Sequence, residues 1–364
     1  MNDYNFWEKY LNSLKLEIKK LCEEKEKIYV DLHIHSIYSS DGKQTIKEII
    51  ETTKNKGFDI IAITDHDTVS AYDELYEILK NGLTKPLIIP GIEFTVDNKE
   101  YGNQCHQLQL FINPKDSNFL KIVNKGKKAM YARAKIQFQR LEENLAMLEL
   151  KNKYSLNYSY KSYLYYLRKY NLIPEYDTLC EYLMSKFIKK NITTFHVLDL
   201  LEKYNELDVY EDRKEFKKKR FAVLRNKYEI NDENKYNVRF LLSMLAVREV
   251  DDDWWDKPSS GSLSVNSYGQ LTIEDLDNNY PIYFAHPTEK KIEVVRKIIT
   301  NTNKIVGLEK NIRNPYQDEN NFKNLLLEKK LNIIMGSDSH DATLKFYDNM
   351  EFYALSKDDI KKII

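Results

Sequence analysis

The chain has 364 residues, of which 42% are hydrophobic and 31% charged, a composition that excludes a disordered chain and allows one large core or two smaller ones. Lysine plus arginine and aspartate plus glutamate number 56 each, so the net charge indicates neither nucleic acid nor an acidic partner. Cys22, Cys105 and Cys180 are far apart and form no CxxC pair, which indicates neither a disulfide framework nor a thiolate zinc site.

Residues 1–27 predict an N-terminal amphipathic helix over residues 4–26, whose role is packing. Its apolar residues recur at four-residue steps: Phe6, Tyr10, Leu14, Ile18 and Cys22. This segment lacks the apolar run of a signal peptide, and no later stretch approaches the roughly 18 apolar residues of a membrane helix. We therefore expect a cytoplasmic protein without a membrane partner.

Residues 28–125 alternate β-rich and helical segments. Predicted strands lie in "KIYVDLHIH", "DIIAITDHD" and "LIIPGIEF", and the helices between them end at Gly57 and Gly82. The alternation returns over residues 279–364, with strands in "PIYFAHP", "KIVGLEK" and "NIIMG", whereas residues 126–278 form a mostly helical insertion and linker. The predicted fold class is therefore α/β, with one parallel sheet or barrel in two parts around the insertion.

Histidines and carboxylates follow these apolar runs. His33 and His35 are two residues apart and share one face of a strand. The other candidates stand at later strand ends or just beyond them: His66, Glu93, His106, His286, Asp338 and His340. The C-terminal strand ends of an α/β barrel form its active face, so these side chains predict a site for zinc, manganese or iron.

Other interpretations stay open for individual residues. A lone histidine at a strand end is more often a hydrogen-bonded core residue, and only the joint pattern favours ligands. Asp65 and Asp67 flank His66 and can be ligands, can hold an imidazole in place or can cap a helix. Asp65 is therefore also a candidate catalytic residue. Asp41 precedes Gly42 and can be a turn residue, although we favour a ligand.

Five motifs resemble those of the polymerase and histidinol phosphatase (PHP) superfamily. In chain order they are "DLHIHSIYSSDG", "GFDIIAITDHDT", "PGIEFT", "FAHP" and "GSDSHD", and they cover residues 28 to about 112 and 279 to 364. The resemblance implies a distorted (β/α)7 PHP barrel that holds two or three divalent ions (Mn, Fe or Zn) at its C-terminal mouth.

The same resemblance implies a ligand for each ion. The first ion is assigned to His33, His35, Glu93 and Asp338. Glu93 bridges to a second ion, which His106 and His286 complete. The third ion is assigned to Asp41, His66 and His340.

Within the superfamily, the motifs resemble the branch of nucleotide phosphatases and 5′ to 3′ exoribonucleases, whose insertion opens with an arginine-bearing helix. Phosphate oxygens beyond the metals need cations, and Arg133, Arg140 and Arg248 of the insertion are candidates, although helix arginines are usually solvated. His196 and a metal-polarised water are the two candidates for the general acid.

Two ions about 3.5–4 Å apart can hold a bridging hydroxide that attacks phosphorus in line. The predicted function is therefore hydrolysis of a phosphate ester of a nucleotide or a nucleic-acid end. Two alternatives remain. One is a noncatalytic, metal-stabilised module that binds a partner protein through the insertion. The other is a small-metabolite phosphatase resembling those that act on histidinol phosphate.

The insertion is rich in lysine and tyrosine. Residues 151–250 hold 20 basic and 14 acidic residues, with 13 of the 27 tyrosines of the chain. Basic grooves with stacking aromatic side chains bind single-stranded nucleic acid, although biased composition or simple helix packing also explains this pattern. The acidic "DDDWWD" at 251–256 can be another cation site, although we favour a loop that caps or closes over the barrel mouth.

Overall fold

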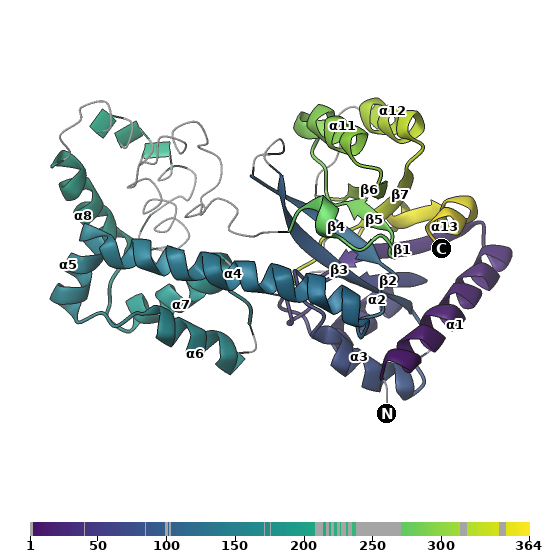
Figure 1. Cartoon of the computed structure of the whole chain (residues 1–364), viewed down its shortest axis with the longest axis horizontal. Coiled ribbons are helices and arrows are strands. Elements are labelled where there is room, and N and C mark those ends of the chain that lie inside the picture. The colour runs from purple at the N-terminus through teal and green to yellow at the C-terminus, as the bar shows by residue number, and fades with distance from the viewer. Residues whose placement is uncertain are drawn as a thin grey trace. The chain divides into compact units, whose positions relative to one another are not determined.

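The computed structural model describes residues 3–39, 41–83, 85–98, 101, 103–170, 172–174, 176–207, 271–313, 319–341 and 347–364, with short pieces between 214 and 237 (Figure 1). The chain divides into two compact units, a barrel unit (residues 1–128 and 269–364) and a helical unit (residues 129–268). Arg248 and the loop at 251–256 lie outside the described residues. The predicted domain limits after residues 27, 125 and 278 stay predictions.

One sheet of eight strands forms the barrel unit, in the order β7-β6-β5-β4-β3-β2-β1-β8. The strands are β1 (Lys27–Ile34), β2 (Ile60–Ile63), β3 (Leu87–Asn98), β4 (Asn103–Leu110), β5 (Ile282–Phe284), β6 (Ile305–Asn311), β7 (Asn332–Gly336) and β8 (Ala354–Ser356). Backbone hydrogen bonds of 2.9 Å from Asp338 N to His33 O and from His35 N to Ser339 O close the sheet between β1 and the end of β7.

The predicted α/β barrel is confirmed, with one difference in strand direction. Strands β1, β2 and β3 are parallel to one another, and so are β5, β6 and β7. Strand β4 is antiparallel to both of its neighbours, and β8 is antiparallel to β1. A short hairpin thus joins β3 to β4, where the alternation of strands and helices predicted a parallel arrangement.

Helices flank the sheet of the barrel unit (Figure 1). They are α1 (Asp3–Glu24), α2 (Ile46–Lys56), α3 (Ala71–Lys80), the first part of α4 (Ser117–Glu143), α11 (Ile292–Asn301), α12 (Glu319–Lys329) and α13 (Lys357–Ile363), with 3₁₀ turns η2 (Ile273–Asp275), η3 (Glu289–Lys291) and η5 (Met350–Tyr353). Helix α2 shows why such segments are helical. Thr45 and Glu48 form a capping box at its start, and Gly57 ends it at φ 85°, where a side chain would be strained.

The core has an inner and an outer layer. The inner layer includes Leu32, Ala62, Ile89, Leu108 and Ile334, and the apolar face of α1 joins it through Leu14, Ile18 and Cys22. The outer layer lies between the strands and the surrounding helices and includes Ile63, Ile92 and Leu308. Successive side chains along a strand thus point alternately into the inner and the outer layer.

A β-bulge in β1 changes this alternation beside the histidines. Asp31 pairs with Ile61 and Ile34 pairs with Ile63, so Leu32 and His33 together oppose the single residue Ala62. Val30 and Leu32 belong to the inner layer, whereas Ile34 belongs to the outer one. The extra residue therefore lets the apolar side chains of β1 and the imidazoles above them face the same interior.

The helical unit has a core of its own. It contains the last turns of α4 with α5 (Leu145–Tyr154), α6 (Tyr160–Tyr170), α7 (Tyr176–Ile188) and α8 (Thr194–Glu206). Phe138, Leu150, Tyr163, Leu183 and Leu198 are fully buried in this core. In the part of the chain that the structure describes, no helix is long and apolar enough to cross a membrane.

Trp7 of α1 provides a test of the packing. Its ring is fully buried and contacts the rings of Phe6, Tyr10 and Tyr72. We expect Trp7→Ala to lower the free energy of unfolding by about 3–5 kcal/mol, because the change leaves a large cavity. Leu16→Ala on the same helix is the control, since Leu16 is 58% exposed. Urea denaturation measures both, and equal losses would contradict the packing of α1.

Candidate metal centre

The structure brings nine predicted ligands together at one mouth of the barrel. They come from the ends of β1, β2, β5 and β7, the loops that follow these strands, and the β3–β4 hairpin: His33, His35, Asp41, His66, Glu93, His106, His286, Asp338 and His340. Eight of them fall into three groups, and within each group the candidate ligand atoms lie within 4.8 Å of one another. His286 joins them through its contacts with Glu93 and His106. That these side chains bind metal stays a prediction.

The first group forms a small cage from His33, His35, Glu93 and Asp338. His33 Nε2 lies 3.0 Å from His35 Nε2 and 3.1 Å from Glu93 Oε2. His35 Nε2 lies 3.2 Å from both Glu93 Oε2 and Asp338 Oδ1, and His33 Nε2 lies 3.6 Å from Asp338 Oδ1. An ion about 2.0–2.2 Å from every ligand has ligand atoms separated by about this much.

Glu93 is fully buried and links this group to a second one. Its Oε2 faces His33 and His35, and it also lies 3.1 Å from His66 Nδ1. Its Oε1 lies 3.0 Å from His106 Nδ1 and 3.1 Å from His286 Nε2, and those two nitrogens are 3.2 Å apart. One carboxylate thus offers one oxygen to each group, which is the geometry of a bridging ligand.

The third group joins Asp41, His66 and His340 with His35. Asp41 Oδ2 lies 2.8 Å from His340 Nε2 and 3.5 Å from His66 Nε2. The rings of His35 and His340 stack with their centroids 4.5 Å apart. Asp41 therefore lies where a ligand would lie, beside two imidazoles.

Hydrogen bonds around the cage direct lone pairs into it. His33 Nδ1 lies 3.0 Å from the Glu309 carboxylate, so the proton of a neutral ring belongs on Nδ1 and the lone pair on Nε2. Ser39 Oγ donates to Asp41 and lies 3.2 Å from His35 Nδ1, which assigns the same tautomer to His35. Two lone pairs and a carboxylate oxygen then meet at about 3 Å, and only a positive charge stabilises such a contact.

The electrostatics of the cage agree with this need for positive charge. Burial by itself lowers the pKa of His33, but the neighbouring Glu93 and Glu309 outweigh it and hold that pKa well above its usual value. Burial raises the pKa of Glu93, yet His33, His66 and His106 together hold it well below its usual value. A divalent ion satisfies these carboxylates and imidazoles at once, so the residues present fit a metal centre.

The backbone is strained at two of the proposed ligands. His286 has φ 29° and Asp338 has φ 53°, in the left-handed region that side chains disfavour. Such residues cost of the order of 1–3 kcal/mol each and persist where the surroundings hold them, often at functional sites.

The two aspartates beside His66 support loops. Asp65 is buried, and its carboxylate accepts hydrogen bonds from Ser36 N (2.6 Å) and Ser36 Oγ (2.7 Å). Asp67 Oδ1 accepts a hydrogen bond from Thr95 N at 3.1 Å. Asp65 therefore fixes the turn after β1, and its catalytic role stays a prediction.

The remaining predicted residues belong to the helical unit. His196 lies in the first turn of α8, where its Nδ1 accepts a hydrogen bond from Thr193 N at 3.0 Å and its ring contacts Tyr154. Arg133 is half-buried in α4, and the side chain of Arg140 lies outside the described part of the structure. The roles of these residues, like that of Arg248, stay predictions.

Two residues at the centre were not anticipated from the sequence. Glu309 is fully buried on β6 and contacts His33. Arg313 follows the same strand, and its Nη1 lies 3.5 Å from Asp338 Oδ2. In the structure Leu308 belongs to the outer layer, so the side chain of its neighbour Glu309 faces the interior.

Comparison with known proteins gives a family match. The model of the PHP domain matches residues 31–196. A phosphoribosyl 1,2-cyclic phosphate 1,2-diphosphodiesterase from Eggerthella lenta is 31% identical over 80 residues, which are 22% of this chain. The aligned part spans 29% of the length of that relative.

Solved structures show weaker likeness. A protein of Bifidobacterium adolescentis assigned as a metal-dependent phosphoesterase is 15% identical, with a TM-score of 0.44 over 85% of this chain and 87% of its own. An amidohydrolase from Chromobacterium violaceum is also 15% identical, with a TM-score of 0.49 over 90% of this chain and 98% of its own. TM-scores below 0.5 do not by themselves establish a common fold, so the family match carries the conclusion. Together with the barrel, it shows that residues 31–196 of this chain are related to the PHP domain.

Proposed function

We propose that the protein is a metal-dependent phosphoesterase that acts on a phosphate ester of a nucleotide or a nucleic-acid end. The observation that carries the proposal is the position of Glu93, whose two oxygens face two separate groups of imidazoles. A structural metal site usually has four protein ligands around one ion and leaves no coordination position open. A carboxylate that bridges two neighbouring groups is suited to a pair of ions instead. The relative from Eggerthella lenta is named for phosphodiester cleavage, which supports the same class of reaction.

The residues of the centre have separate tasks in this proposal. When bound, divalent ions lower the pKa of water toward about 7 and neutralise charge on phosphoryl oxygens. Glu93 and Asp338 would hold the ions, and the apolar inner layer below them, with Leu32 and Ile89, excludes bulk water. Arg313 is exposed beside Asp338, where its guanidinium can receive phosphate oxygens of a substrate.

Glu93→Gln tests the proposed centre. We expect this variant to lose more than about 100-fold in kcat/KM toward p-nitrophenyl phosphate and toward a short 5′-phosphorylated oligonucleotide, because an amide cannot bridge two cations as a carboxylate does. Glu351→Gln is the matched control, since Glu351 is an exposed carboxylate paired with Lys27. Chelation should abolish the activity, and manganese, iron or zinc should restore it.

The proposal fails if Glu93→Gln hydrolyses both compounds at the rate of the unaltered protein, or if the chelated protein remains active. Absence of hydrolysis by the metal-loaded protein would favour the noncatalytic, metal-stabilised module instead. Activity confined to small phosphomonoesters would favour a metabolite phosphatase.

A basic and aromatic face of α6 favours a polymeric substrate. Lys161, Tyr165, Arg168 and Lys169 recur at three- and four-residue steps and are all exposed, with Tyr165 exposed by 70%. Helix α6 contains no acidic residue, and neither Lys161 nor Arg168 forms an ion pair with any residue that the structure describes.

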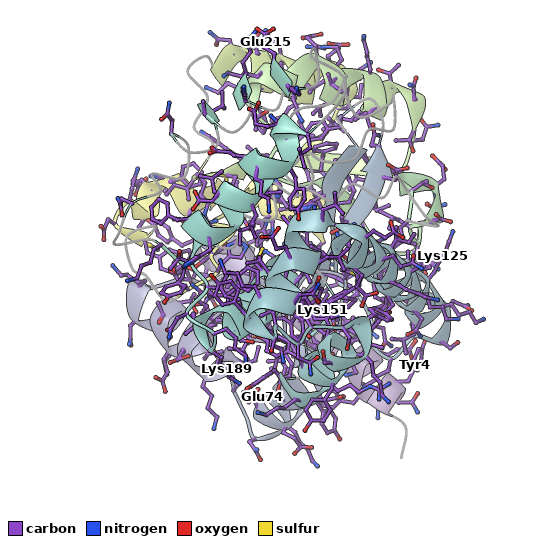
Figure 2. All side chains as sticks on the ribbon, turned by 90° about the vertical axis from the view of Figure 1, so that its left-hand side faces the viewer. Tyr4, Glu74, Lys125, Lys151, Lys189 and Glu215 are labelled. Atoms are coloured by element: carbon purple, nitrogen blue, oxygen red, sulfur yellow. The ribbon has the colours of Figure 1, made fainter. Side chains whose placement is uncertain are left out.

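Lysines of α5 and α6 also lie beside tyrosine rings. Lys169 Nζ lies 4.8 Å from the ring centroid of Tyr170, and Lys151 Nζ lies 5.7 Å from that of Tyr158. Lys151 and Lys189 are both exposed and are labelled in Figure 2. Tyr158 is buried, whereas Tyr165 and Tyr170 are exposed, and such rings together with exposed lysines suit a single-stranded nucleic acid, whose bases and phosphates they contact.

Neutralising this face tests the nucleic-acid part of the proposal. We expect a triple change of Lys161, Arg168 and Lys169 to glutamine to weaken binding of a single-stranded oligonucleotide. The slope of log Kd against log salt should fall by about 0.7 for each charge removed, while hydrolysis of p-nitrophenyl phosphate stays unchanged. Fluorescence anisotropy at several salt concentrations measures the effect.

The control removes three exposed lysines from α1, by changing Lys9, Lys19 and Lys20 to glutamine. This variant also loses three positive charges, but from a different surface of the protein. Equal losses in the two triple variants would show that general charge explains the binding, and the α6 face would then have no special part in it.

A further inference from the structure

We propose that Glu309 is the positioning residue of the centre, because it sets the tautomer of His33 and holds the backbone at His286. The proposal rests on the proposed metal-dependent function, and it concerns a residue outside the three ligand groups. Glu309 is fully buried on β6, so its carboxylate depends on protein donors and not on water.

Three donors from three strand ends meet at this carboxylate. Oε1 lies 3.0 Å from His33 Nδ1 and accepts a hydrogen bond from Asn311 Nδ2 at 2.8 Å. Oε2 accepts a hydrogen bond from the backbone N–H of His286 at 2.6 Å. An ionised carboxylate donates nothing and accepts at both oxygens, so it alone among the side chains of this size satisfies all three donors.

The contact with Nδ1 decides which nitrogen of His33 faces the cage. A neutral imidazole carries one proton, and the backbone N–H of His286 and the Asn311 amide already require Glu309 to accept. The proton of His33 therefore belongs on Nδ1. Its Nε2 lone pair then faces His35 Nε2 and Glu93 Oε2, where an ion can bind it.

The contact with the His286 backbone secures the second group. His286 adopts φ 29°, which its side chain disfavours, and its Nε2 lies 3.1 Å from Glu93 Oε1. The short hydrogen bond to Glu309 holds the backbone at this place. One buried carboxylate thus connects a ligand of the first group to a ligand of the second.

The glycine at 336 makes room for this contact. A Cβ atom at Gly336 would lie 2.6 Å from His33 Cβ, and it would also overlap Glu309 Oε1. Any side chain at this position would therefore push Glu309 and His33 apart. The space is an observation independent of the hydrogen bonds, and it indicates that the pair is built into the barrel.

Glu309→Gln tests the proposal while conserving size. If the amide oxygen accepts from His286 N, the amide NH₂ group faces His33 Nδ1 and donates to it, which transfers the ring proton to Nε2. We expect metal affinity to fall about 10–100-fold, as for other partners of metal-binding histidines. Competition with a chromogenic chelator measures the affinity. ¹⁵N NMR of histidine-labelled, metal-free protein reports the tautomer at a pH above the raised pKa of His33, where the ring is neutral.

Asp59→Asn is the matched control. Asp59 is a buried carboxylate. It accepts a hydrogen bond from the backbone N–H of Tyr29 at 3.1 Å and forms an ion pair with Lys25. It lies at the start of β2, at the other end of the strands. We expect this variant to lose stability without any change in metal affinity or in the tautomer of His33.

The outcomes separate this proposal from the proposed function. A Glu309→Gln protein that binds metal as tightly as the original, with an unchanged His33 tautomer, overturns the positioning role whatever its activity. If affinity and tautomer change as expected but neither protein hydrolyses phosphate esters, the positioning role stands and the proposed function fails. Should the variant not fold, the metal-free original decides at a pH where the His33 ring is neutral: a proton on Nδ1 supports the role, and a proton on Nε2 overturns it.

Discussion

The convergence of lone pairs around Glu93 is the constraint on which the rest of the centre depends. Nitrogen and oxygen atoms from five strands and their loops approach within about 3 Å, an arrangement that costs electrostatic energy unless positive charge lies among them. The barrel keeps these atoms together by closing β1 against the end of β7 and by burying apolar side chains beneath them. Folding thus supplies the geometry, and a cation bound there would supply the charge that makes the geometry favourable.

Hydrogen bonds behind the ligands matter as much as the ligands themselves. Glu309 and Ser39 each contact the Nδ1 atom of one histidine of the β1 pair, so both rings present Nε2 to the same point. Asp31 accepts hydrogen bonds from His33 N and Ser337 N and thereby joins β1 to the loop after β7. A layer of buried acceptors around the cage therefore fixes both the orientation and the protonation of its imidazoles.

The sequence predicted the α/β barrel and the gathering of nine side chains because each strand end carries its own local signal. The antiparallel direction of β4 was not predictable from alternation alone, since a hairpin and a crossover both separate two strands. Glu309 escaped attention because a glutamate beside a lysine in "GLEKN" is typical of a solvated surface pair, and only its partner His33, 276 positions earlier, reveals its burial. The insertion was the hardest part, because lysine and tyrosine recur throughout this chain and composition alone does not separate a packed helix face from a binding surface.

The bulge at Leu32 and His33 changes which residues of β1 face the barrel interior. Below it the even-numbered residues meet the interior, and above it the odd-numbered residues do, so one inserted residue converts a core strand into a ligand-bearing one. Substitutions in this segment affect single contacts, whereas a change of length by one residue would turn the whole strand end over and send both imidazoles to the wrong side. The number of residues between Val30 and His35 therefore determines which way the imidazoles face, whatever the identity of each residue between them.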